Sequence, residues 1–92
     1  MNTELKKSIL SAIADNGIEL AELTGSDRQI KWAEEIRLSA IDLLGVSKVA
    51  KCKPLLDIIN SLVDSEWWIE HDDVLGTNKT QTLKCFEMEL NG

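Results

Sequence analysis

The residues best suited to chemistry surround the single histidine of the chain, His71. Its carboxylate neighbours in the sequence are Glu66, Glu70, Asp72 and Asp73. A histidine and a carboxylate four or five residues apart can share one helix face and hold a metal ion. This spacing is generic, and the chain has neither an H-E-x-x-H pattern nor a cysteine pair nearby. We therefore expect a solvated helix terminus here, where a cation suits the helix dipole, and no metal or other cofactor.

Nucleophilic catalysis has no better support. Cys52 falls on an apolar periodicity between Val49 and Leu55, which predicts a buried and inert thiol, and Cys85 stands alone near the end of the chain. The sequence contains no nucleophile elbow, phosphate-binding loop or dinucleotide-binding glycine pattern. We predict a protein without enzymatic activity, with reduced cysteines.

Composition and charge narrow the class of protein. The 92 residues suffice for one domain, and 43% apolar residues with one proline and five glycines indicate a folded chain. No apolar run is long enough to span a membrane, and the first ten residues are too polar for a signal peptide, so we expect a cytoplasmic protein. The net charge of −6 disfavours direct binding to nucleic acid and favours basic partners, although solubility alone also explains it.

Two adjacent tryptophans, Trp67 and Trp68, offer an aromatic contact. Neighbouring residues on a helix point about 100° apart, so at least one ring must lie at the core margin or on the surface. One interpretation places Trp67 in the core with Trp68 over its edge. The other exposes a ring as an anchor for a partner.

An acidic stretch surrounds these tryptophans, because no lysine or arginine occurs between Asp57 and Asp73. Carboxylates and an aromatic ring on one surface suit a basic partner, such as the channel of a nucleic-acid-binding protein. An ordinary solvated face is the alternative. The predicted partner-binding residues are Asp64, Glu66, Trp68, Glu70, Asp72 and Asp73.

The elements that position these residues are predicted to be helices. Apolar periodicity predicts a helix from Thr3 to Asn16, capped by Asn2 or Thr3, followed by a short helical turn over residues 18–23. Ser26 and Gln29 form a capping-box pattern that starts a helix ending at Gly45. Trp32 lies one turn before an apolar residue of this helix, so we expect its ring to be mainly buried.

The second half of the chain is less regular. Ser47 is a candidate cap, and Pro54 requires either a helix start nearby, which we favour, or a bend. Asp64 and Ser65 either continue this helix or cap a short last one, and residues 77–92 are either helical or extended. We predict a single all-α domain over residues 1–92, a compact bundle of three or four short helices.

Two segments resemble small proteins carried by phages and other mobile elements. The recurring pattern of these proteins is G-S-x-x-Q-x-x-W-A-x-x-I followed by W-I-D or W-I-E. The matching residues are Gly25, Ser26, Gln29, Trp32, Ala33 and Ile36, then Trp68, Ile69 and Glu70. At least one anti-CRISPR protein against a type I system is similar in the first segment. Some relatives carry a zinc ribbon before it, but this chain lacks those cysteines, so the resemblance implies no metal site.

The resulting hypothesis is a phage or mobile-element protein in the cytoplasm of a bacterial host. It would bind and inhibit a basic, nucleic-acid-targeting defence complex without catalysis, as anti-CRISPR proteins do. The alternative is a regulatory or structural interaction module of a prophage, homodimeric through Trp67 and Trp68. A small enzyme or metal protein around Glu66, Glu70 and His71 is the third possibility.

Overall fold

The computed structural model describes residues 2–75 and 78–91. In this part of the chain it contains helices and no strand, so the predicted all-α class is confirmed. The helices are α1 (Thr3–Asp15), α2 (Asp27–Leu44), α3 (Val46–Lys51), α4 (Lys53–Ser61), α5 (Ser65–Glu70) and α6 (Lys79–Asn91). They exceed the predicted three or four because residues 46–70 divide into three short helices and the C-terminal segment adds α6.

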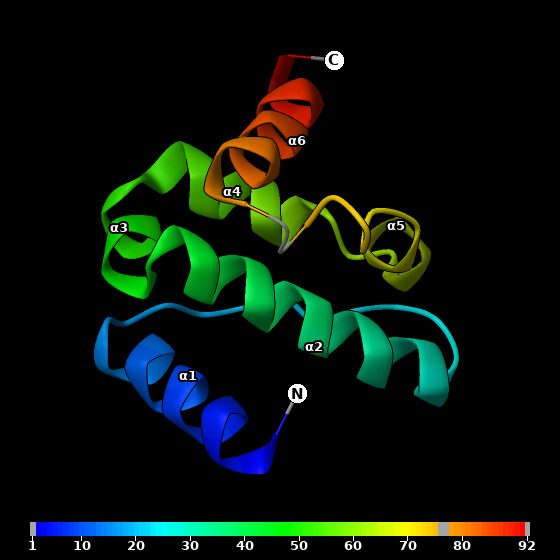
Figure 1. Ribbon diagram of the computed structural model, residues 1–92, viewed down its shortest axis with the longest axis horizontal. Helices are drawn as coiled ribbons and strands as arrows, with labels where there is room; N and C mark the ends of the chain where they lie inside the picture. The colour runs from blue at the N-terminus through cyan, green and yellow to red at the C-terminus, as the bar shows by residue number, and fades with distance from the viewer. Residues whose placement is uncertain (1, 76–77, 92) are drawn as a thin grey trace.

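Helix α2 is the centre of the molecule. It crosses the middle of Figure 1, with α1 on one side and α4, α5 and α6 on the other. Its contacts extend to α1, α3, α5 and α6. Both sides of the bundle therefore depend on the broad apolar face of this one helix, where Ala33, Ala40 and Ile41 are completely buried.

The first two helices start as the sequence predicts. The Asn2 side-chain oxygen accepts a hydrogen bond of 2.7 Å from the backbone N–H of Leu5 and caps α1. At α2 the Gln29 N–H donates to Ser26 Oγ over 3.2 Å, and the Ser26 N–H donates to Gln29 Oε1 over 3.1 Å. The reciprocal pair is the predicted capping box, and it fixes the first turn of the central helix.

Two predictions between α2 and α4 are wrong. Ser47 does not cap a helix, because α3 begins directly after Gly45, whose φ of +95° turns the chain within one residue. Cys52 is exposed instead of buried, since it is the residue between α3 and α4. Pro54 has no N–H to continue the hydrogen bonds of α3, so a new helix starts beside it, as the favoured interpretation predicted.

The segment over residues 18–23 is not the predicted helical turn. Side chains from other elements satisfy its backbone: the Asn60 amide donates to Glu19 O, and the Ala21 N–H donates to Asn60 Oδ1, both over 2.9 Å. Arg37 Nη1 donates to Ala21 O over 2.7 Å. Burial lowers the pKa of the Arg37 guanidinium, and the charge of Glu34 acts in the opposite direction. The segment still contributes to the core through buried Ile18 and Leu23.

The C-terminal segment is helical over α6 rather than extended. A backbone donor in the first turn of α6 has a nearby partner, because the Gln81 N–H donates to Asn78 Oδ1 over 2.8 Å. Thr82 fits inside the helix because its hydroxyl donates to Asn78 O over 2.9 Å. Phe86 is buried and links α6 to the core. Residues 77 and 92 of the predicted tail lie outside the described residues.

Candidate interaction surface

Trp68 is a core residue and not a partner contact, so its place among the predicted binding residues is wrong. Its side chain is completely buried, and its Nε1–H donates to Leu62 O over 2.7 Å. The ring packs edge-on against Trp67 and Phe86, with centroids 5.0 and 5.8 Å apart. Helix α5 packs against α2, and Trp68 links α5 to α6 within the core. The predicted homodimer edge therefore loses one of its two rings.

Trp67 is only half-buried, so the interpretation that placed Trp67 in the core with Trp68 over its edge is wrong. Its ring stacks on His71 with centroids 4.3 Å apart and on Phe86 with centroids 6.0 Å apart. His71 Nδ1 lies 2.7 Å from Trp67 O at the end of α5. The histidine thus belongs to an aromatic stack, and no group of three metal-ligating side chains occurs among the described residues.

The other predicted binding residues share one property, exposure to solvent. They lie on α5, at its cap and in the turn that follows it, and are called the acidic surface below. Its members are Asp64, Glu66, Glu70, Asp72 and Asp73. Among the described residues, none of these carboxylates forms an ion pair within 4 Å. Their charges therefore face solvent without a paired cation.

The backbone around Asp64 attaches the acidic surface to the start of α2. The Thr24 N–H donates to Val63 O over 2.7 Å, and the Ser65 N–H donates to Thr24 O over 3.1 Å. Asp64 Oδ1 in turn accepts from the Glu66 N–H over 3.0 Å and caps α5. Asp64 therefore has a structural role in addition to its charge.

Trp32 is not mainly buried as expected, because its side chain is 51% exposed. Ala33 and Ile36 take the inward direction of α2, and Trp32 points about 100° away from its neighbour Ala33. Leaving about half of so large a ring in water forgoes roughly 3 kcal/mol of hydrophobic stabilisation. An exposed tryptophan on the central helix is therefore a candidate contact that the apolar periodicity did not identify.

The Trp32 side chain lines two open grooves. The larger, of about 790 Å³, is lined by Ser26, Arg28, Gln29, Lys31, Trp32 and Glu35. The smaller, of about 260 Å³, is called the Trp32 groove below and is lined by Leu5, Trp32, Glu35, Ile36, Ser39 and Asp72. Asp72 belongs to both the acidic surface and the Trp32 groove. The acidic surface thus adjoins Trp32 at Asp72, whereas the predicted combination of exposed carboxylates with Trp68 does not occur because Trp68 is buried.

Comparisons of the chain with known protein families, with curated proteins and with solved structures find no match. Within the described residues, no helix has the length and apolar character needed to cross a membrane.

Proposed function

We propose that this chain is a small acidic protein that binds and inhibits a bacterial nucleic-acid-targeting defence complex, in the manner of anti-CRISPR proteins and without catalysis. The observation that carries the proposal is the acidic surface, five exposed carboxylates on one short helix and its flanks. No lysine or arginine occurs between Lys53 and Lys79 to neutralise them. The resemblance of the Gly25 to Ile36 segment to mobile-element proteins supports the same class.

The physical basis of inhibition is competition for a basic channel. A channel that holds nucleic acid is lined with lysine and arginine, whose charges attract any surface that presents several carboxylates close together. The net charge of −6 adds long-range attraction to such a partner and repulsion from nucleic acid itself. The protein would therefore occupy the channel in place of the nucleic acid.

The fold supports this role because it holds the helix that bears the carboxylates in place before binding. Helix α5 is attached at its start through Thr24 and anchored in the core through the buried ring of Trp68. A surface that is already ordered loses less conformational entropy when it binds. The carboxylates can thus contribute most of their attraction to affinity.

The test is a plasmid-interference assay in bacteria that carry single type I CRISPR effector complexes, with and without the protein. We expect loss of interference with at least one effector. Reversing Glu66, Glu70 and Asp73 to lysine should restore interference, since like charges in close contact cost several kcal/mol. These positions leave the Asp64 cap intact.

A matched control reverses three exposed carboxylates elsewhere, Asp15, Glu19 and Glu22, which changes the net charge equally. This control should inhibit like the wild type. Full interference with every effector in the presence of soluble wild-type protein would contradict the proposed function. Equal loss of inhibition in both variants would show that net charge acts rather than this surface.

A further inference from the structure

We infer that the Trp32 groove is a recognition site for an arginine side chain of a basic partner protein. The inference rests on the proposed function for the nature of the partner, whereas the choice of arginine follows from the groove itself. Three kinds of group meet there: an exposed indole ring, two carboxylates and an apolar wall. Each has a counterpart in the arginine side chain.

The indole ring of Trp32 supplies the first contact. A guanidinium over an aromatic face is attracted by the charge distribution of the ring, and tryptophan is the most favourable of the aromatic residues. The guanidinium is also planar and weakly hydrated, so it stacks on the ring more readily than the ammonium of lysine does. About half of the Trp32 side chain is open to such a contact.

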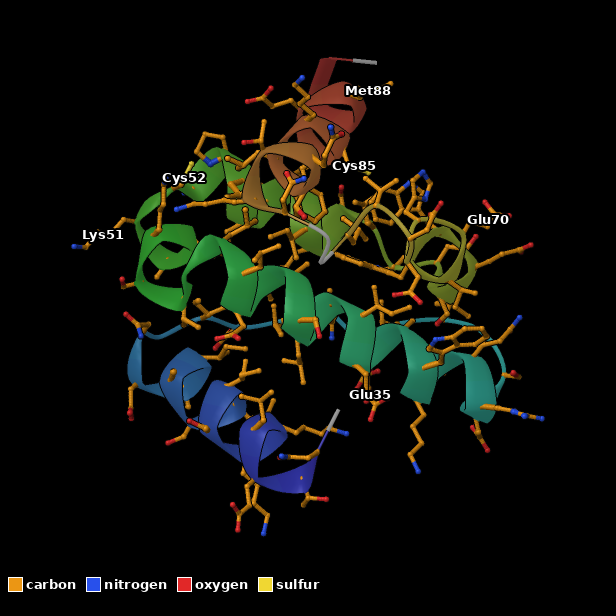
Figure 2. The ribbon with its side chains drawn as sticks, in the orientation of Figure 1. Glu35, Lys51, Cys52, Glu70, Cys85 and Met88 are labelled. Carbon is orange, nitrogen blue, oxygen red and sulfur yellow. The ribbon has the colours of Figure 1, made fainter. Side chains whose placement is uncertain are left out.

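The carboxylates of Glu35 and Asp72 supply the second contact, and they come from different parts of the fold. Figure 2 shows Glu35 projecting from α2 on the side where α1 lies. Within the described residues neither carboxylate has an ion pair within 4 Å, although Lys31 stands four residues before Glu35 on the same helix. One guanidinium has five N–H donors and can engage two carboxylates at once.

Leu5 and Ile36 supply the third contact, an apolar wall. Leu5 is 47% exposed on α1, and Ile36 is buried on α2 with 5% of its surface exposed. The methylene groups of an arginine stem pack favourably on such a surface while the charged end reaches the carboxylates. The groove thus matches the whole side chain and not only its charge.

The charge of the two grooves decides in which of them a cation binds. The larger groove is lined by Arg28 and Lys31, which repel a guanidinium, and Glu35, which lines both grooves, offsets only one of these two positive charges. The Trp32 groove is lined by Glu35 and Asp72 and by no basic residue. The same negative charge disfavours a second copy of this acidic chain as the occupant.

The direct test is an NMR titration of the ¹⁵N-labelled protein with Nα-acetyl-arginine methylamide. We expect the Trp32 indole signal to shift and saturate with a dissociation constant on the order of 1–10 mM, as for a single small side chain. Nα-acetyl-citrulline methylamide, which has nearly the same shape without the charge, should cause little shift. The Trp68 indole, hydrogen-bonded to Leu62 O, serves as a reference that does not move.

Single substitutions test which side chains of the Trp32 groove contact the arginine. Trp32→Leu keeps an apolar side chain but removes the ring, and should weaken arginine binding about tenfold when followed by the backbone signals around the groove. Glu35→Gln and Asp72→Asn should each weaken it about three- to tenfold. Asp42→Asn, on an exposed part of α2 outside the groove, is the matched control and should bind like the wild type.

The outcomes separate this inference from the proposed function. Equal shifts with arginine and citrulline, or unchanged binding in the Glu35→Gln and Asp72→Asn variants, would overturn the arginine site even if the protein inhibits an effector. Specific arginine binding without inhibition of any effector would support the site and contradict the proposed function. If the protein binds arginine at this groove and also inhibits an effector, Trp32→Leu and Glu35→Gln should reduce inhibition at least severalfold.

Discussion

Replacing the buried Trp68 by phenylalanine should lower the free energy of unfolding more than replacing the half-exposed Trp32 by alanine. Trp68→Phe removes the N–H that donates to Leu62 O and leaves a small cavity beside Phe86. The orphaned carbonyl costs about 1–3 kcal/mol, and the missing ring volume adds roughly 1 kcal/mol. We expect a loss of about 2–4 kcal/mol, a large part of the 5–14 kcal/mol that is typical of a domain of this size.

Trp32→Ala should lower the free energy of unfolding less than Trp68→Phe does, although it removes more atoms. Truncation of a buried tryptophan costs about 3–5 kcal/mol, but half of this side chain is already in water and no closed cavity is left. Alanine also has the higher helix propensity, which returns roughly 0.5 kcal/mol within α2. We therefore expect a loss of only about 1–2 kcal/mol.

The assay is urea denaturation followed by far-ultraviolet circular dichroism, which does not depend on tryptophan fluorescence. Trp68→Phe should have the lower midpoint, with similar slopes for both variants. A loss above 3 kcal/mol in Trp32→Ala, at or beyond that of Trp68→Phe, would refute the reasoning. Trp32 would then be a core residue, and the Trp32 groove would lose its central contact.

Further predictions concern the start of α2 and α5. Ser26→Ala should lower the free energy of unfolding by about 1 kcal/mol in urea denaturation. Gln29→Ala should lower it less in the Ser26→Ala background than in the wild type, because the two side chains act as one capping box. Additive losses would show that they act separately. Gly25→Ala should cost about 1–3 kcal/mol, because Gly25 has a φ of +134° and an added Cβ would lie 3.3 Å from Ser65 Cβ; an unchanged thermal midpoint would contradict this. Ser65→Ala should be neutral or stabilise by about 1 kcal/mol, because the buried Ser65 hydroxyl has no hydrogen-bond partner among the described residues; a clear loss of stability would reveal a role for that oxygen.

The sequence predicted the parts of the fold that local chemistry decides. The cap at Asn2, the capping box at Ser26 and the restart at Pro54 each depend on a few neighbouring residues, and all three are confirmed. The segment over residues 18–23 was predicted wrongly because Asn60 and Arg37 supply its hydrogen bonds from distant positions. Local periodicity contains no information on such partners.

The candidate surface was predicted only in part, for a similar reason. The acidic residues are exposed as expected, since charges without partners stay in water. The exposure of the tryptophans depends on which face of each helix meets α2, and an apolar stripe specifies that direction only to within a broad arc. Trp32 and Trp68 were therefore assigned to the wrong environments, and the Trp32 groove, formed by α1, α2 and the turn after α5, was not predictable from any single segment.

The central claim is that the acidic surface binds a basic effector, and the salt dependence of that binding tests it most directly. The measurement is the dissociation constant between the purified protein and the effector it inhibits, as salt rises from 0.1 to 1 M and the screening length falls from about 10 to about 3 Å. We predict that wild-type affinity falls steeply over this range and that the Glu66, Glu70 and Asp73 to lysine variant does not bind while remaining folded. Wild-type affinity in that folded variant, or affinity independent of salt, would contradict the claim.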